Sequence, residues 1–444
     1  MFDQDVAPKL TTQQLSWFVG ALRTLDTDVA DPERIDQVRL LEELKSAASA
    51  TQATVTTTFV ASQKAAQVEA GVPANQVGKG IAAQVGLAKR ESPARAKQYV
   101  GWAGILSTEL PGTLEELQAG RITEWRAKIV AKETIWLDRA DRLRIDAELA
   151  PRLESLGDRQ VEAAVKKRAY ELDPHGYLER IARAEKDRRV TLRPAPDTMS
   201  ILSGLLPVAQ GVAVFAALTR QADSLRAGGD ERSKGQIMAD TLVERVTGQV
   251  AAPDTSVEVK IVMTDQALFN HGDGSSEPAH AEGYGPIPAD LARRIARSAA
   301  EGAKLWLRRL YADPSNGQLV AMDSQRRLFA DGLAEFLLTR DQFCRTPWCD
   351  APVRHSDHVV AVADGGETSA ANGQGLCEAC NYAKQAAGWR ARASGGGAGE
   401  QVETTTPTGH TYRGRPPDPP GAQRQALSLA EAHFRRLIEQ HAAA

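Results

Sequence analysis

The sequence contains no hydrophobic run long enough to cross a membrane. Its longest uncharged stretch, between Asp197 and Arg220, is interrupted by Ser203, Pro207 and Gln210, whereas a membrane-spanning helix needs about 20 predominantly apolar residues. A buried helix that begins near Pro207 is the better interpretation. The opening residues, MFDQDVAPKL, contain neither a basic segment nor an apolar one, so no secretory signal is expected. Both absences favour a cytoplasmic protein.

Neither sign of charge dominates the chain. Its 444 residues include 54 Lys and Arg and 57 Asp and Glu, for a net charge of −3, so the composition does not by itself indicate nucleic-acid binding. Two segments are locally basic. RIARAEKDRRVTLR, from Arg180, contains six basic and two acidic residues, and RRIARSAAEGAKLWLRR, from Arg293, contains six basic and one acidic. Solvated helix faces explain each segment at least as well as a nucleic-acid contact.

Cysteine is scarce, and its distribution is uneven. All four cysteines lie within 37 residues, as Cys344-x4-Cys349 and Cys377-x2-Cys380, with 27 residues between the pairs. Clustered cysteines in a cytoplasmic protein bind metal more often than they form disulfides. Four thiolates from two turns are a preferred ligand set for structural zinc, and a segment with little apolar core gains folding free energy from the ion. Chance clustering or a disulfide pair is the alternative.

The predicted fold class is a mainly α N-terminal region followed by a mixed α/β region and a small, zinc-stapled C-terminal domain. Residues 1–188 are expected to be helical, beginning with a capping box at Thr11 and Gln14. Apolar residues recur at helical spacing and predict packing faces; they are Leu15, Phe18, Val19 and Leu22, and then Ile35, Val38, Leu41 and Leu44.

Strands are expected among the helices of residues 189–335, which continue the N-terminal domain. The pattern predicts a hairpin that turns at Pro196-Asp197, a strand from Val257, and a second hairpin around Asn316-Gly317. A polar segment with His271 and His280 is interpreted as an exposed loop, because it lacks a cysteine or paired carboxylate at ligand spacing. The stapled domain covers residues 336–393. Residues 394–444 are expected to be a linker and tail with a short amphipathic helix near LAEAHFRRLIEQ.

The residues between the cysteine pairs predict a ββα unit. VRHSDHVVAV is β-branched, DGGETSAANGQG is typical of a loop, and EACNYAKQA permits a helix. This order puts Asp357 and His358 near a strand end, Asn372 in the loop and Asn381 on the helix. Carboxylate, amide and imidazole groups suit a hard divalent cation and its bound waters. A neutral histidine beside such a cation can accept a proton from water.

This segment resembles an HNH endonuclease domain of the cysteine-bearing kind, in which a ββα-metal finger cleaves phosphodiester bonds. The resemblance implies that His358 is the general base and that Asn372 orients the loop and, through it, the base. It implies that Asp357 and Asn381 hold a catalytic cation, with Asn381 at a position where relatives have His or Asn. Magnesium (Mg²⁺) is the default for such oxygen ligands, with Mn²⁺ or Ni²⁺ as substitutes. The structural zinc (Zn²⁺) on the four cysteines is a separate ion.

Two further residues bear on the resemblance. Lys384, one helical turn beyond Asn381, is predicted either to contact a phosphate or to be an ordinary solvated lysine. Ala361 departs from the pattern, because many relatives have proline after the Asp-His step.

The upstream sequence is also familiar. ELDPHGYLERIARAEKDRRVTLRPAPDTMSILSGLLP and GDERSKGQIMADTLVERVTG resemble the domain of unknown function 222 type, which is common upstream of HNH domains in actinobacterial proteins. This likeness implies family membership and no mechanism.

The predicted function is metal-dependent hydrolysis of DNA, most simply double-stranded DNA, by a protein that is nucleoid-associated when it acts. A zinc-stapled nucleic-acid-binding protein without catalysis is the alternative. A regulatory role for the helical domain, with the nuclease as its effector, is compatible with the first reading. Residues 340–400 contain six Lys or Arg and seven Asp or Glu. Affinity for DNA is therefore expected to come from the upstream basic segments or from a partner.

The two histidines of the HSDH segment require a choice. Side chains alternate along a strand, so His355 and Asp357 should share a face and His358 the opposite one. That geometry alone favours His355 as the site residue. The resemblance places the base directly after the aspartate, so we expect His358 to be the base, with the strand ending or distorting near it. His355 is expected to pack near the zinc turns.

Overall fold

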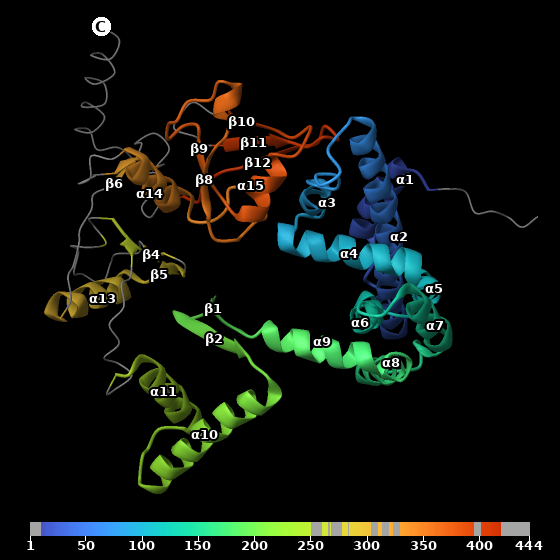
Figure 1. Cartoon of the computed structure of the whole chain (residues 1–444), viewed down its shortest axis with the longest axis horizontal. Helices are drawn as coiled ribbons and strands as arrows, with labels where there is room; N and C mark the ends of the chain where they lie inside the picture. The colour runs from blue at the N-terminus through green and yellow to red at the C-terminus, as the bar shows by residue number, and fades with distance from the viewer. Residues whose placement is uncertain are drawn as a thin grey trace, which may run out of the picture. The chain divides into compact units, whose positions relative to one another are not determined.

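The computed structural model describes residues 10–249, 260–264, 267, 278–282, 284–302, 310–312, 319–322, 329–394 and 401–418. They form two compact units. The first comprises residues 1–58 and 101–176, and the second comprises residues 59–100 and 177–444. Helices account for the regular structure as far as Lys186, and strands appear from Arg189 onward (Figure 1). The predicted fold class is confirmed. No helix in the described ranges combines the length and apolar character needed to span a membrane.

The first unit is a helical bundle, and the boundary between the units falls within α2 and α4. Its elements are α1 (Thr12–Ala21), η1 (Leu22–Thr24), α2 (Asp31–Glu69), α4 (Pro93–Glu109), α5 (Pro111–Gln118), α6 (Glu124–Thr134), α7 (Arg139–Leu149), η2 (Ala150–Arg152) and α8 (Asp158–Leu172). Fully buried side chains fill the core; the largest include Leu106, Leu110, Leu117, Ile122, Val130, Ile145, Leu153, Val161 and Val165. Aliphatic side chains from α4–α8 therefore hold this unit together.

The capping box that starts α1 is present, but the apolar stripe beyond it is not covered. The Gln14 amide N–H donates to Thr11 Oγ1 (3.3 Å), and the Thr11 N–H donates to Gln14 Oε1 (2.8 Å). Seven of the eight side chains predicted to pack are exposed, with Leu15 at 51% and Ile35 at 69%, and Leu41 is half-buried. The expectation of intramolecular packing faces on α1 and early α2 is wrong for the seven exposed residues.

The upstream part of the second unit consists of helices and an isolated β-hairpin. Its elements are α3 (Ile81–Lys89), α9 (Pro174–Lys186), β1 (Arg189–Ala195), β2 (Met199–Leu205), α10 (Val208–Ala227) and α11 (Lys234–Thr247). The predicted hairpin is confirmed: β1 and β2 pair from Arg189↔Leu205 to Ala195↔Met199. Its turn places Asp197 (φ 60°) and Thr198 (φ 59°) in the left-handed region.

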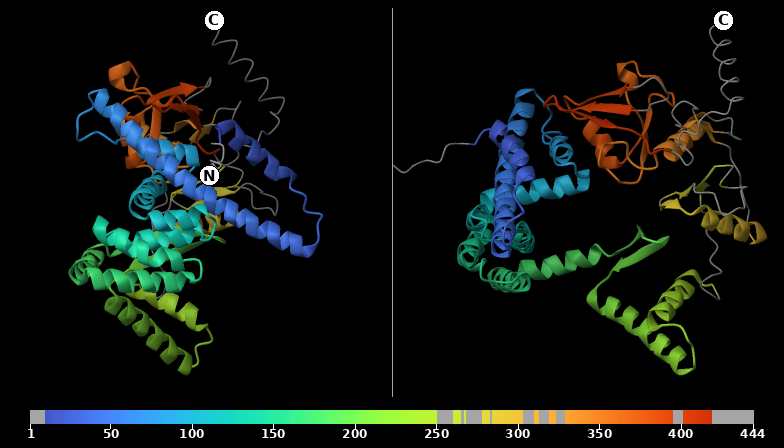
Figure 2. Two further views of the ribbon diagram at one scale, coloured as in Figure 1. Left: turned by 90° about the vertical axis from the view of Figure 1, so that its right-hand side faces the viewer. Right: turned by 180° about the vertical axis from the view of Figure 1, so that it is seen from behind.

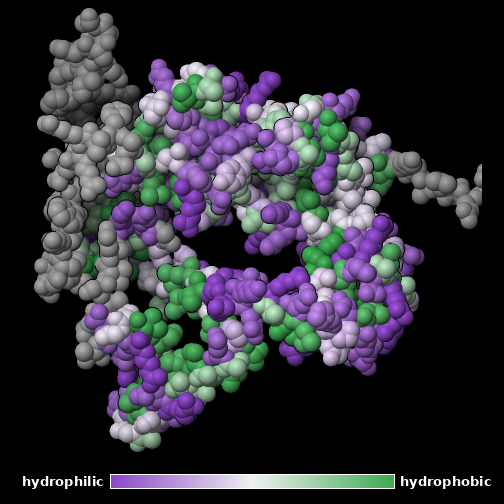
Figure 3. All heavy atoms as spheres, in the orientation of Figure 1, coloured by the Kyte–Doolittle hydropathy of each residue, from purple (hydrophilic) through white to green (hydrophobic). Residues whose placement is uncertain are grey.

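The helix after the hairpin begins where expected but is not buried. Pro207 is the N-cap of α10, which packs against α11 (Figure 2). Val208 is 84% exposed and Phe215 is 66% exposed, and Ala222 is the one buried side chain of the helix. In Figure 3, hydrophobic side chains are visible around the β1–β2 hairpin and along α10, whereas hydrophilic side chains cover α9.

Short strands follow. They are β3 (Ile261–Val262), β4 (Ala279–Ala281) and β5 (Gly285–Ile287), which form one sheet, and β6 (Leu310–Ala312) with β7 (Leu319–Met322); α13 covers Ala289–Gly302. The strand predicted from Val257 is present as β3, and the hairpin predicted around residues 316–317 is present as β6–β7. The start of the former, the turn of the latter, His271 and the predicted C-terminal helix lie outside the described residues. His280 lies in β4 and not in an exposed loop, and burial lowers its pKa.

The C-terminal part begins with α14 (Phe329–Asp341) and contains the predicted ββα order. Its elements are β8 (His355–His358), η4 (Val362–Asp364), β9 (Gly373–Leu376), α15 (Glu378–Lys384), β10 (Arg390–Ser394), β11 (Gln401–Thr405) and β12 (Thr411–Gly414). The two cysteine turns together with β8, β9 and α15 are called the ββα finger below.

A three-stranded sheet follows the ββα finger, and two of its strands, β11 and β12, lie where the sequence predicts a linker and tail. β11 pairs with both β10 and β12 in antiparallel fashion. Glu403 lies inside the sheet and accepts hydrogen bonds from Arg392 and Arg413. The sequence pattern does not predict these strands because they are short and polar. The charged side chain of the central strand, Glu403, is tolerated there because two arginines pair with it.

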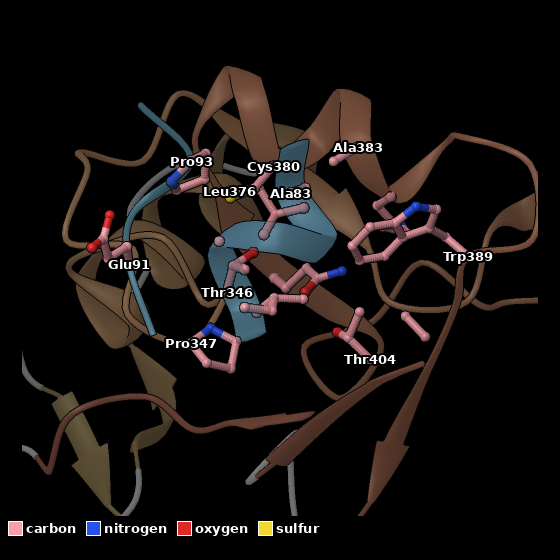
Figure 4. A pocket seen from close by; sticks show the side chains of 15 residues that line it. Ala83, Glu91, Pro93, Thr346, Pro347, Leu376, Cys380, Ala383, Trp389 and Thr404 are labelled. Atoms are coloured by element: carbon pink, nitrogen blue, oxygen red, sulfur yellow. The ribbon is translucent and has the colours of Figure 1, made fainter. Parts of the chain in front are cut away.

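The C-terminal sheet contacts the ββα finger, and α3 lies against the sheet and against Trp389, which follows α15. Gly414 approaches the first cysteine turn so closely that a Cβ would lie 2.1 Å from the Arg345 carbonyl oxygen. Gly80 approaches Trp389, and Thr408 Oγ1 donates to Gln84 Oε1 of α3 (3.1 Å). A small pocket lies at this contact, with Glu91 at one side and Trp389 at the other (Figure 4).

Candidate functional site

The four cysteine sulfurs converge as a tetrahedral ion would require. Their Sγ atoms all lie within 4.8 Å of one another, and Cys349 Sγ is 3.7 Å from Cys377 Sγ. Zinc–sulfur bonds of about 2.3 Å in a tetrahedron place sulfurs about 3.8 Å apart, whereas a disulfide bond is about 2.05 Å. All four thiols are free and buried. The donor set and its spacing fit zinc and exclude the disulfide alternative.

The thiols also influence one another electrostatically. Hydrogen bonding with Cys344 is the largest cause that lowers the pKa of Cys377, and the same partner raises the pKa of Cys380. Four adjacent thiols therefore cannot all ionise by themselves, because each thiolate opposes the next. A divalent cation is what stabilises four thiolates together, so metal binding at this cluster releases protons.

β8 and β9 fix the direction of the two histidines. The ladder pairs His355 with Leu376, Asp357 with Gln374 and His358 with Gly373. His355 and Asp357 face α15: the His355 ring centroid lies 6.3 Å from that of Tyr382, and Asp357 meets Lys384. His358, the last residue of β8, belongs to the opposite face. Strand alternation therefore persists up to the residue at which β8 ends.

His358 points toward the loop that follows β8. Its Nε2 lies 2.8 Å from Thr368 Oγ1, and the ring is half-buried. Thr368 was not among the predicted site residues. Its only signal in the sequence is a hydroxyl in the loop that also carries Asn372, and such loops contain several.

Asn372 ties this loop to the end of β8. Its Oδ1 accepts from the Val360 N–H (2.9 Å), and its Nδ2 donates to the carbonyl oxygens of Val360 (3.0 Å) and Glu367 (2.8 Å). The Val359 N–H donates to the Asn372 carbonyl (2.6 Å). Gly366 makes room for the amide, since a Cβ there would lie 1.9 Å from Val360 O and 2.7 Å from Asn372 Nδ2.

Lys384 reaches across from α15 to β8. Its Nζ lies 2.5 Å from Asp357 Oδ2 and donates to the His358 carbonyl oxygen. Lys384 and Asp357 are 17% and 22% exposed, so the predicted alternative of a solvated lysine does not describe this side chain. Asn381 is buried on the same helix, and its Oδ1 accepts from Gln385 Nε2 (3.5 Å). Because Asn381 precedes Lys384 by three residues, the two are neighbours on one helix face.

Comparison with protein families gives two matches. The family described as Domain of unknown function (DUF222) matches residues 38–341, more than half of the chain. The chain belongs to the DUF222 family. An HNH endonuclease domain matches residues 344–387, a range that includes the four cysteines and all the predicted catalytic positions. The expected order of a DUF222 region followed by an HNH domain is confirmed. No curated protein and no solved structure matches the chain.

The two basic segments of the DUF222 region differ in their availability. In the segment from Arg180, the side chains of Arg183, Lys186, Arg188, Arg189 and Arg193 are exposed. In the segment from Arg293, that first arginine is 7% exposed and binds the Ala267 carbonyl and Asp290. Arg293 therefore belongs to the fold, whereas Arg294 and Arg297 are exposed. Among the described residues, the segment from Arg180 offers more exposed basic side chains and is the stronger candidate for a contact with phosphate.

Proposed function

We propose that this protein is a metal-dependent endonuclease that hydrolyses phosphodiester bonds of DNA through its HNH domain. The HNH match supports a nuclease in general terms. The finer proposal rests on Asn372. Its side-chain amide accepts a hydrogen bond from the Val360 N–H and donates one to the Val360 carbonyl oxygen, and so fixes the backbone just after His358. A binding module that had lost catalysis would not need this arrangement beside an intact Asp-His pair.

His358 is the proposed general base. Its imidazole accepts the proton of the attacking water, and a positioned base of this kind contributes about 10²–10⁴-fold to the rate. The contact between Nε2 and Thr368 Oγ1 would hold the ring orientation before substrate binds. Thr368 is proposed as a group that fixes the ring orientation in either tautomer, because the hydroxyl can donate to or accept from the ring nitrogen.

Asp357 and Asn381 are the proposed ligands of the catalytic cation. Carboxylate and amide oxygens suit Mg²⁺, with Mn²⁺ or Ni²⁺ as substitutes. A cation bound there would polarise a non-bridging phosphate oxygen and stabilise the leaving 3′-oxygen. The Lys384 ammonium now neutralises Asp357. Lys384 would therefore turn away when the cation binds, which frees its charge to meet the phosphate of the substrate.

The exposed basic segment at α9 and β1 is the proposed source of affinity for DNA. Arg189 and Arg193 lie on the same face of the β1–β2 ribbon, and a two-stranded ribbon fits the major groove of duplex DNA. Phosphate neutralisation by lysine and arginine supplies most non-specific affinity. Double-stranded DNA is thus the proposed substrate, and the nucleoid is the proposed place of action in the cytoplasm.

Plasmid cleavage tests the proposed activity. The zinc-loaded protein should nick or linearise supercoiled plasmid with Mg²⁺ or Mn²⁺ and be inactive in EDTA. His358→Ala should lose at least ~10²-fold in rate, whereas the matched control His355→Ala should lose far less. DNA binding without metal-dependent cleavage would instead support the zinc-stapled binding protein. Loss of cleavage in His355→Ala with retention in His358→Ala would exchange the roles of the two histidines.

A further inference from the structure

We propose that Arg340 and Asp341, at the end of the DUF222 region, are positioning residues of the nuclease site and act through Asn372. The proposal rests on the proposed function. These two residues end α14 and are the last residues of the DUF222 match, and two residues separate that match from the HNH match. Their sequence, an adjacent Arg-Asp pair, gives no indication of burial, since such residues are almost always at the surface.

Both side chains are nevertheless in the interior. Arg340 is 2% exposed and Asp341 is 1% exposed. The guanidinium binds the carboxylate with two hydrogen bonds, from Nε to Oδ1 (2.7 Å) and from Nη2 to Oδ2 (3.0 Å). A buried ion pair is a weak source of stability compared with apolar side chains of the same size. Its presence here therefore calls for a role that an apolar pair could not fill.

The remaining N–H groups of the Arg340 guanidinium hold the backbone on both sides of Asn372, which apolar side chains could not do. Arg340 Nη1 donates to the Ala370 carbonyl oxygen (2.7 Å), and Nη2 donates to the Gly373 carbonyl oxygen (2.8 Å). Ala370 and Gly373 lie on either side of Asn372 in the sequence. A single rigid group thus fixes the backbone before and after the asparagine, which a lysine could not do because it lacks the planar fork.

Two further contacts bring α14 into place. A Cβ on Gly373 would lie 2.8 Å from Leu337 Cδ1, so the glycine allows the helix to approach β9. Asp341 Oδ2 accepts from the Gly375 N–H of β9 (2.6 Å). The contacts form a continuous series from α14 through Arg340 to Asn372, and then through Val360 to the end of β8 and His358. The boundary between the two family matches is therefore not a functional boundary.

A double-mutant cycle tests this series with the full-length, zinc-loaded protein. Arg340→Lys should lower kcat by about 10- to 100-fold, the effect of about one to two lost hydrogen bonds to a charged group, with KM for DNA nearly unchanged. In an Asn372→Ala background the same substitution should cause little further loss, because both act through one element. Equal losses in the two backgrounds, or no loss in either, would overturn the proposal.

Arg345→Lys is the matched control. Arg345 is as deeply buried and meets the same carboxylate, with Nη1 3.4 Å from Asp341 Oδ1, but it enters from the first cysteine turn. It should change kcat less than Arg340→Lys does. If Arg340→Lys does not retain zinc and fold, Asp341→Asn goes through the same cycle with the same criterion.

Amide exchange separates this inference from the proposed activity, since it needs no cleavage. The Val360 N–H donates to Asn372 Oδ1, and the Asn381 N–H, which donates to Cys377 O, serves as an internal reference within α15. Arg340→Lys should accelerate exchange at Val360 relative to Asn381. Unchanged relative exchange refutes the positioning role, whatever the plasmid assay shows. Accelerated exchange in a protein that does not cleave DNA would refute only the proposed function.

Discussion

Gly366→Ala is the substitution that most directly tests how the loop that contains Asn372 is held. Gly366 is outside the left-handed region, so alanine can adopt its backbone conformation, but the new methyl group would lie 1.9 Å from Val360 O and 2.7 Å from Asn372 Nδ2. The backbone oxygen cannot rotate away. The loop must move, and Asn372 must give up some of its three side-chain hydrogen bonds.

The magnitude follows from those bonds. At about 1 kcal/mol each, the loss of all three amounts to ~3 kcal/mol. If the held loop is what presents His358, the rate of plasmid cleavage should fall by a factor of roughly 100. The rate should be measured at saturating Mn²⁺ and DNA, together with zinc content. A variant that binds zinc normally and cleaves at the wild-type rate would refute the reasoning that Asn372 acts by holding this loop.

Gly365→Ala is the control, since the two glycines are adjacent and differ in what surrounds them. Gly365 has φ +86°, and no atom lies within 4 Å of the position that a Cβ would take. Alanine there costs about 1–2 kcal/mol of backbone strain without touching Asn372. The finger should lose stability while the remaining folded protein cleaves at close to the normal rate. A larger rate loss for Gly365→Ala than for Gly366→Ala would contradict the steric argument.

Three further outcomes are expected. Cys377→Ser should abolish zinc binding and unfold the ββα finger while the first unit stays helical, as elemental analysis and circular dichroism would report; full zinc occupancy would be the contrary result. Lys384→Met should strengthen Mn²⁺ binding roughly fivefold, or ~1 kcal/mol, because it frees Asp357; unchanged or weaker binding in calorimetry would argue against competition. Hydrogen bonds from Arg392 and Arg413 lower the pKa of Glu403, so its stabilisation is complete above the usual pKa near ~4.3 and is lost as the pH falls through the lower folded value. Glu403→Gln should remove this acid-dependent part of the unfolding transition of the sheet, and an identical pH profile would count against it.

The parts of the molecule that could be predicted are those whose signals are local. Cysteine spacing, a β-branched segment, a glycine-rich loop and a helix-permissive segment lie close together in the sequence, and together they determine the finger. The hairpin at Pro196-Asp197 is similarly local, because the turn and both strands are contiguous. In each case the chemistry of the residues and their short-range order suffice.

The parts that could not be predicted depend on partners distant in the sequence. The local sequence around Arg340 is typical of an exposed position. Its burial depends on hydrogen bonds to backbone carbonyl groups that lie 30 and 33 residues away in the sequence. The C-terminal sheet buries Glu403 between two arginines, which a hydrophobicity pattern cannot reveal. The sequence predicts that Lys384 contacts a phosphate or solvent. Its pairing with Asp357 could not be predicted because only the fold of the finger brings α15 and β8 together. Conversely, the apolar character of α10 predicts a buried helix, but most of its side chains are exposed in the described part of the chain.

The contact between Thr408 and Gln84 spans 324 residues of sequence, and this separation has a consequence during synthesis. At about 5–20 residues per second, α3 leaves the ribosome roughly 15–65 s before the strand turn that it meets. α3 and the C-terminal sheet can meet only after the turn that contains Thr408 has been synthesised. Such long loops slow folding, and here the delay also means that a chain stalled before Thr408 lacks the contact between the C-terminal sheet and α3. A nascent chain would thus complete the contact between α3 and the C-terminal sheet only after the DUF222 region and the HNH domain have both been synthesised.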